Sequence, residues 1–186
     1  MYCTDLEETQ WQVIKKILNL QERKRKYDLR EIWNTIFYLV KTGCQWRMLP
    51  SNFAPWELVY YYYRKWCSLG EFDLLLNNLR EKVRVNMGQK AECSLGKIIL
   101  ADAGYRGEIA DKIKTAFGYI LEVVVSGDKV NGFKPIGKRW IVERTFSWFD
   151  NYRRLCRNDE WTFDSAEEMV KLASIRMLLN KILTGS

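Results

Sequence analysis

Histidine is absent from the 186 residues of the sequence. Its absence excludes zinc sites with imidazole ligands, Ser-His-Asp triads and acid–base catalysis by histidine. An enzyme with this composition must use carboxylates, lysine, tyrosine, serine or cysteine for its chemistry.

Paired cysteines and long apolar runs are also missing. The five cysteines are dispersed, odd in number and never spaced as CxxC, so they are expected to be reduced thiols rather than a disulfide framework. Charged residues interrupt the most apolar segments well short of a membrane-spanning length. The first residues, MYCTDLEETQ, are acidic and polar where a signal peptide needs a basic and then an apolar stretch. The chain is therefore expected in the cytoplasm, without membrane contact.

Basic and aromatic residues are abundant instead. The 30 lysines and arginines exceed the 23 acidic residues and give a net charge of +7, beside 8 Trp, 10 Tyr and 8 Phe. Most of the basic excess falls within residues 1–90. This balance suits a polyanionic partner, and a basic globular protein without such a partner is an equally compatible alternative.

The first ninety residues have the pattern of a helical bundle. Apolar residues at helical spacing, together with capping and stop residues, predict helices over the segments 4–20, 28–42, 55–69 and 71–87. Short connections between them indicate a bundle of the helix-turn-helix kind, which is compatible with nucleic-acid binding.

Two clusters within this region have alternative interpretations. The run YYYYRKW, residues 60–66, sets aromatic rings beside basic side chains that could stack on bases and contact phosphates, although core packing with a wet rim is favoured. The charged run 21–26 is interpreted as a solvated loop, with a phosphate clamp as the alternative.

The second half has a different pattern. A polar stretch of small residues, 88–96, is the expected boundary between a domain of residues 1–90 and a domain of residues 97–186. Short apolar strands at 97–101 and 119–125 flank a helix at 108–117, and this order predicts a parallel βαβ unit. Helices are expected over 139–154 and 165–183.

Two carboxylates in this half are candidates for chemistry. Asp102 follows a strand and precedes a glycine-containing turn, where parallel sheets gather ligands, and a turn or helix-cap aspartate is the alternative. Glu143 lies on a predicted helix, where an ion pair with Arg139 is the alternative. The basic residues around Glu143 would allow a site that holds both a metal and a phosphate backbone: Lys138, Arg139, Arg144, Arg153 and Arg154.

Three blocks resemble bacterial insertion-sequence transposases of the DDE type, in the insertion-sequence-five group. The block IFYLVKTGCQWRMLPSNFAPWELVYYYYRKW is similar to their N-terminal region, ILADAGYRGE to their second-carboxylate motif, and GFKPIGKRWIVERTFSWFDNYRRL to their glutamate motif. The resemblance implies that Asp102 and Glu143 are catalytic ligands of Mg²⁺ or Mn²⁺, and that Lys138, Arg139 and Arg144 contact DNA. It also implies an RNase H-like sheet for the catalytic part, and double-stranded DNA at the ends of the element as partner.

The sequence departs from this family at one place. The family's first catalytic Asp lies on a strand in a motif similar to Ile-Ile-Asp-Ser-Gln, but here the polar stretch before Gly96 continues directly into Lys97. We therefore expect an internal deletion that removed this strand and its neighbours. The expected fold is α+β and mostly helical: a helical bundle of the helix-turn-helix kind and a truncated RNase H-like remnant with about two parallel strands.

This deletion has chemical and structural consequences. Two carboxylates are too few to hold and align two metal ions, so strand transfer is expected to be negligible. A reduced sheet is a poor scaffold, and it would leave apolar residues such as Trp140, Phe146 and Trp148 in need of a partner. The hypotheses are a catalytically defective transposase-family protein, a DNA-binding regulator that binds element ends or pairs with intact transposase, a minimal one-metal nuclease, and a gene product without a selected role. Homo-oligomers or mixed oligomers with intact transposase are the expected assemblies.

Overall fold

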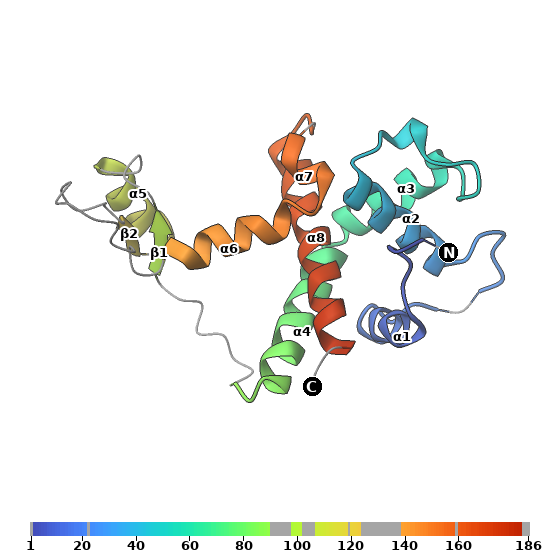
Figure 1. Ribbon diagram of the computed structural model, residues 1–186, viewed down its shortest axis with the longest axis horizontal. Coiled ribbons are helices and arrows are strands. Elements are labelled where there is room, and N and C mark those ends of the chain that lie inside the picture. The colour runs from blue at the N-terminus through green and yellow to red at the C-terminus, as the bar shows by residue number, and fades with distance from the viewer. Residues whose placement is uncertain are drawn as a thin grey trace. The chain divides into compact units, whose positions relative to one another are not determined.

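A computed structural model of the chain describes residues 2–21, 23–89, 98–101, 107–118, 120–123, 139–158 and 160–183. The chain divides into two compact units, of which the first comprises residues 1–91 and 149–186 and the second residues 92–148. The first unit contains these helices (Figure 1): α1 (Glu8–Ile17), α2 (Leu29–Thr42), the 3-10 helix η1 (Trp46–Met48), α3 (Trp56–Ser68), α4 (Glu71–Asn86), α7 (Arg153–Arg157) and α8 (Phe163–Leu183).

Helix α2 has clear local signals at both ends. The Asp28 side chain accepts a hydrogen bond from the Arg30 amide at 3.3 Å, as expected of an N-terminal cap. Gly43 ends the helix in the left-handed region at φ 69°, where its amide donates to the Leu39 carbonyl. A side chain at Gly43 would also come within 3.1 Å of Arg153 on α7. The helix predicted over 28–42 is confirmed.

Helix α1 is shorter than the predicted 4–20. Asp5 does not cap it, because its carboxylate accepts a hydrogen bond from the Tyr2 amide at 2.8 Å. The Gln10 side chain instead accepts from the Glu7 amide at 3.1 Å, and the helix begins at Glu8. It ends at Ile17, shortly before Asn19 adopts a positive φ of 46°.

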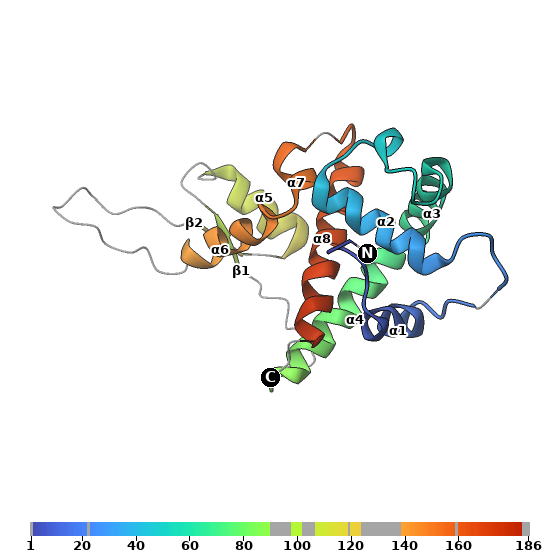
Figure 2. The same cartoon turned by 45° about the vertical axis from the view of Figure 1, so that its right-hand side comes forward.

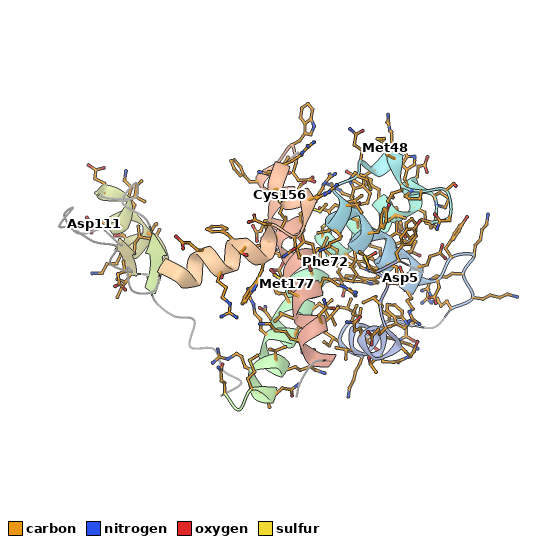
Figure 3. The ribbon with its side chains drawn as sticks, viewed as in Figure 1. Asp5, Met48, Phe72, Asp111, Cys156 and Met177 are labelled. Atoms are coloured by element: carbon orange, nitrogen blue, oxygen red, sulfur yellow. The ribbon has the colours of Figure 1, made fainter. Side chains whose placement is uncertain are left out.

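The core of the first unit is built on α2, α4 and α8. Trp33 of α2 is fully buried and stacks on Trp66 of α3, with the ring centroids 4.8 Å apart, while Phe72 of α4 meets it edge-on. Helix α8 lies alongside α4 (Figures 1 and 2). Figure 3 shows Phe72 among these helices, whereas Met48 points outward from η1.

The segments that make up the first unit differ from the predicted domains, which were residues 1–90 and 97–186. Residues 149–186 pack with the N-terminal helices rather than with residues 97–148. The physical reason is burial of apolar side chains, since Met169, Leu172 and Leu179 of α8 are in the same core as α2 and α4.

The single helix predicted over 139–154 is also divided. Helix α6 (Arg139–Phe149) ends before Tyr152, whose extended backbone precedes the short helix α7. Tyr152 is buried in the core of the first unit, and this burial fixes the chain where the helix breaks.

The second unit contains the described strands and most of α6. Strands β1 (Ile98–Ala101) and β2 (Ile120–Val123) pair in parallel, and α5 (Glu108–Phe117) connects them in sequence. Phe146 and Trp148 of α6 are exposed, whereas the Trp140 side chain lies outside the described residues. The mostly helical fold is confirmed, and the RNase H-like character of this unit stays a prediction. No helix in the described ranges combines the length and the apolar character needed to cross a membrane.

Candidate nucleic-acid interface

The two predicted catalytic carboxylates differ in what the structure shows of them. Asp102 lies outside the described residues, and Glu143 is exposed on α6. Within the described ranges, no three His, Cys, Asp or Glu side chains gather closely enough to hold a metal ion. A complete metal site is therefore not present in the part of the chain that is described.

The five basic residues predicted to contact DNA are not equivalent. Lys138 and the Arg139 side chain lie outside the described residues. Arg144 is exposed on α6 with its guanidinium 5.2 Å from the centre of the Trp148 ring, and Arg153 is exposed on α7. Arg154, by contrast, is buried.

The Arg154 guanidinium is occupied inside the first unit. Its Nε donates to Oε1 of Glu160 at 2.6 Å, and its Nη1 donates to the Cys44 carbonyl at 3.0 Å. The Ser165 hydroxyl donates to the other Glu160 oxygen. Only 8% of the Arg154 side chain is exposed, and its contacts hold α7, the end of α2 and the start of α8 together. The structure therefore gives Arg154 a structural role in place of the predicted DNA contact.

A groove of about 1260 Å³ opens beside this ion pair, entirely within the first unit. Residues from η1, from α3 and from the segment between α7 and α8 line it. We name it the aromatic groove after its exposed and half-buried members: Trp46, Arg47, Trp56, Tyr60, Arg64 and Trp161.

Aromatic rings and arginines line this groove together. The Trp46 and Tyr60 rings meet edge-on with centroids 5.2 Å apart, and the Arg47 guanidinium lies 5.4 Å from the centre of the Trp56 ring. Trp161 is 98% exposed, an unusual position for the largest apolar side chain. Flat rings beside cations are the chemistry that binds bases and phosphates together.

Tyr63, Cys67 and Glu168 also line the groove; Tyr63 is buried, and Cys67 and Glu168 are half-buried. Burial raises the pKa of the Tyr63 hydroxyl above its ordinary range, and burial together with the nearby Glu168 raises the pKa of the Cys67 thiol to about 11. Burial also raises the pKa of Glu168, against the opposing hydrogen bond from Lys171, whose Nζ lies 2.8 Å from Oε1. Tyr63 and Cys67 are therefore neutral at physiological pH.

Part of the YYYYRKW cluster fits core packing, and part of it fits an exposed surface that could bind bases and phosphates. Tyr63 and Trp66 are buried in the core, as core packing predicts, whereas Tyr60 and Tyr61 are exposed beside the exposed Arg64 and Lys65. Consecutive helical residues point in different directions, and this geometry produces the division. The sequence pattern did not reveal Trp161 as part of the same surface, although its position among polar residues outside any apolar repeat was a usable signal.

The charged run 21–26 forms a second, smaller basic surface. Arg23 and Lys24 are exposed, while Arg25 folds back so that its Nη1 donates to the Gln21 carbonyl at 3.2 Å. This arrangement is compatible with the solvated loop that was favoured and with the phosphate clamp that was the alternative.

Comparison with known proteins identifies one related family. Residues 6–76 match the family described as "Putative transposase of IS4/5 family (DUF4096)". No curated protein and no solved structure matches the chain. The matched segment runs from before α1 into α4 and includes the η1 and α3 side of the aromatic groove. Residues 6–76 thus support a transposase of the IS4/5 type.

Proposed function

We propose that the chain is a DNA-binding protein of the transposase family whose catalytic site is incomplete. One observation carries the proposal: the family match includes Arg47, Trp56 and Arg64, which line a groove rich in aromatic rings. Double-stranded DNA at the ends of an insertion element is the proposed partner. Arg47 and Arg64 are the proposed phosphate contacts of the first unit, joined by Arg153, which is exposed on α7.

DNA affinity tests this proposal. The double substitution Arg47→Ala with Arg64→Ala is expected to weaken duplex binding in fluorescence anisotropy. Because each lost phosphate contact releases about one counterion fewer, the slope of log K against log salt should become shallower by about 2. The matched control is Arg80→Ala with Lys82→Ala, which removes the same charge from exposed positions of α4 outside the groove. An equal loss of DNA affinity in both double variants would show that the effect comes from net charge alone, and it would contradict an interface centred on the groove.

We also propose that catalysis is defective. By family resemblance Asp102 and Glu143 are the carboxylates for Mg²⁺ or Mn²⁺, and the third carboxylate is missing from the sequence. Two carboxylates are too few to hold and align two metal ions, so the proposed ligand set does not fit a two-metal centre. No metal-dependent step is therefore assigned to this chain.

Cleavage of end-bearing DNA in the presence of Mg²⁺ or Mn²⁺ measures the proposed defect. We expect no cleavage above the level without metal, because two carboxylates cannot align an attacking and a leaving oxygen between two ions. Cleavage that disappears on Asp102→Ala would establish a minimal metal nuclease and overturn the proposed defect.

A second candidate function is regulation or inhibition of an intact transposase. The observation that favours it is the construction of the first unit, whose core is formed by residues 1–91 and 149–186 without the residues between them. Such a unit would keep its DNA-binding surface although the catalytic site is incomplete. The exposed Phe146 and Trp148 would offer an apolar contact to a partner subunit. Excision by an intact relative, measured with and without this chain, distinguishes a regulator from an inert product.

A further inference from the structure

The connection between α1 and α2 contributes to a pocket that the proposed function does not use. The pocket has a volume of about 460 Å³ and lies within the first unit, and we name it the loop pocket. Its described lining has four cationic side chains: Lys15, Arg23, Lys24 and Arg25. Asp28 is the one carboxylate of the described lining. Glu22 of the same connection lies outside the described residues, and counting its charge as well still leaves an excess of two positive charges.

The aromatic groove differs from the loop pocket in its charge. Its described lining has equal numbers of cations and carboxyl groups: Arg47, Arg64, Arg154, Glu160, Asp164 and Glu168. Two of these side chains, Arg154 and Glu160, form an internal ion pair of the fold. A polyanion is therefore attracted more strongly to the loop pocket than to the groove, because electrostatic attraction follows the net charge of the surface.

Arg23 and Lys24 of the loop pocket have no carboxylate partner in the part of the chain that is described. Both are exposed, and neither forms an ion pair there. Arg30 of α2, by contrast, is paired with Glu8 of α1. The Asp28 carboxylate accepts a hydrogen bond from the Arg30 amide, so it already has a structural task as the cap of α2. The loop pocket therefore keeps positive charge that a phosphate can meet.

Arg25 gives the loop pocket a defined shape. Its side chain is half-buried, and its Nη1 donates to the Gln21 carbonyl at 3.2 Å, which closes the connection on itself. A guanidinium has five N–H donors in one plane, so the donors on Nε and Nη2 can still meet phosphate oxygens. Because the connection is already held in this form, less conformational entropy is lost when an anion binds. This geometry favours the phosphate clamp over the solvated loop.

We propose that the loop pocket binds the phosphodiester backbone of duplex DNA, as a contact separate from the aromatic groove. The inference rests on the proposed DNA binding and adds a second set of phosphate contacts to it. Trp11 is the one aromatic residue of the described lining, and it is only 8% exposed, so the pocket offers little ring surface on which an unpaired base could stack. The contact is therefore with the backbone and independent of the base sequence.

The double substitution Arg23→Ala with Lys24→Ala tests the loop pocket in the full chain, by fluorescence anisotropy of a mixed-sequence duplex over a series of salt concentrations. The slope of log K against log salt should become shallower by about 2, and the affinity at about 0.1 M salt should fall on the order of tenfold or more. Two duplexes of different sequence should lose affinity equally. Arg80→Ala with Lys82→Ala is again the matched control, and both double variants should melt at the wild-type temperature because all four side chains are exposed.

The outcomes separate this inference from the proposed function. If Arg23→Ala with Lys24→Ala loses no more affinity than the α4 control, the loop pocket is overturned as a DNA contact. A loss in Arg47→Ala with Arg64→Ala would still leave the proposed function standing. Combining the two loop and the two groove substitutions should make the salt slope shallower by about 4, because contacts at separate sites add. A combined slope no shallower than that of either double variant overturns the separate contact, and a chain that binds no duplex overturns both proposals.

Two further measurements identify the ligand and the part played by Arg25. Polyglutamate, a polyanion without phosphate, should compete poorly with the duplex. Equally tight binding of polyglutamate, lost in Arg23→Ala with Lys24→Ala, would assign the pocket to an acidic protein segment and overturn the proposal. Arg25→Lys keeps the charge but loses the planar fork that holds the Gln21 carbonyl, so duplex affinity should fall several-fold while the salt slope stays unchanged. Wild-type affinity in this variant would overturn the defined phosphate clamp.

Discussion

Replacing Arg154 by methionine is expected to lower the free energy of unfolding by about 3–5 kcal/mol, because it leaves the carboxylate of Glu160 buried without its partner. The side chains of Arg154 and Glu160 are only 8% and 9% exposed, so water cannot solvate the remaining charge. The Cys44 carbonyl would also lose the hydrogen bond that connects it to α7. Urea denaturation followed by circular dichroism measures the loss.

The neighbouring arginine is the matched control. Arg153→Met removes the same charge from an exposed position of α7 and should change stability by no more than about 0.5 kcal/mol. Adding Glu160→Met to Arg154→Met should recover much of the stability, since an apolar pair of similar volume often replaces a buried ion pair without loss. Equal stabilities for the Arg153 and Arg154 variants would contradict the structural role given to Arg154.

Replacing Trp33 by alanine is expected to lower the free energy of unfolding by about 3–5 kcal/mol through the cavity that it creates. Trp33 is fully buried, and its ring contacts Phe37, Trp66 and Phe72 at centroid distances of 4.8–5.6 Å. These contacts connect α2 with α3 and α4, so the cavity would lie where three helices meet.

An exposed tryptophan provides the comparison for Trp33. Trp161→Ala makes the same chemical change at a ring that is 98% exposed and should alter stability by no more than about 0.5 kcal/mol. Trp33→Phe should cost less than Trp33→Ala, because it keeps most of the volume and removes an indole N–H that has no acceptor among the described residues. A Trp33→Ala protein as stable as the Trp161→Ala protein would show that the core does not depend on this ring.

Local signals in the sequence predicted the elements better than their packing. Asp28 and Gly43 act through hydrogen bonds to residues two to four positions away, so the bounds of α2 follow from its own sequence. The docking of α8 against α4 depends on residues about a hundred positions apart, such as the ion pair of Lys171 with Asp73. No local pattern contains that information.

The candidate site shows the same limit. Arg153 and Arg154 are adjacent in a basic run, and nothing in that run distinguishes the exposed guanidinium from the buried one. The distinction comes from Glu160, which lies in the connection between α7 and α8, and from Cys44, which reaches Arg154 only after α7 packs on α2. Likewise, Tyr60 and Trp161 come together only in the folded first unit.

The late position of α8 in the chain affects folding during synthesis. The buried faces of α2 and α4 are complete on the ribosome long before Met169, Leu172 and Leu179 emerge to cover them. Until then those apolar faces are exposed to water and to other nascent chains, which is a state prone to aggregation. Premature termination anywhere before α8 should therefore yield a product that a cell degrades or a chaperone holds, rather than a smaller working DNA-binding unit.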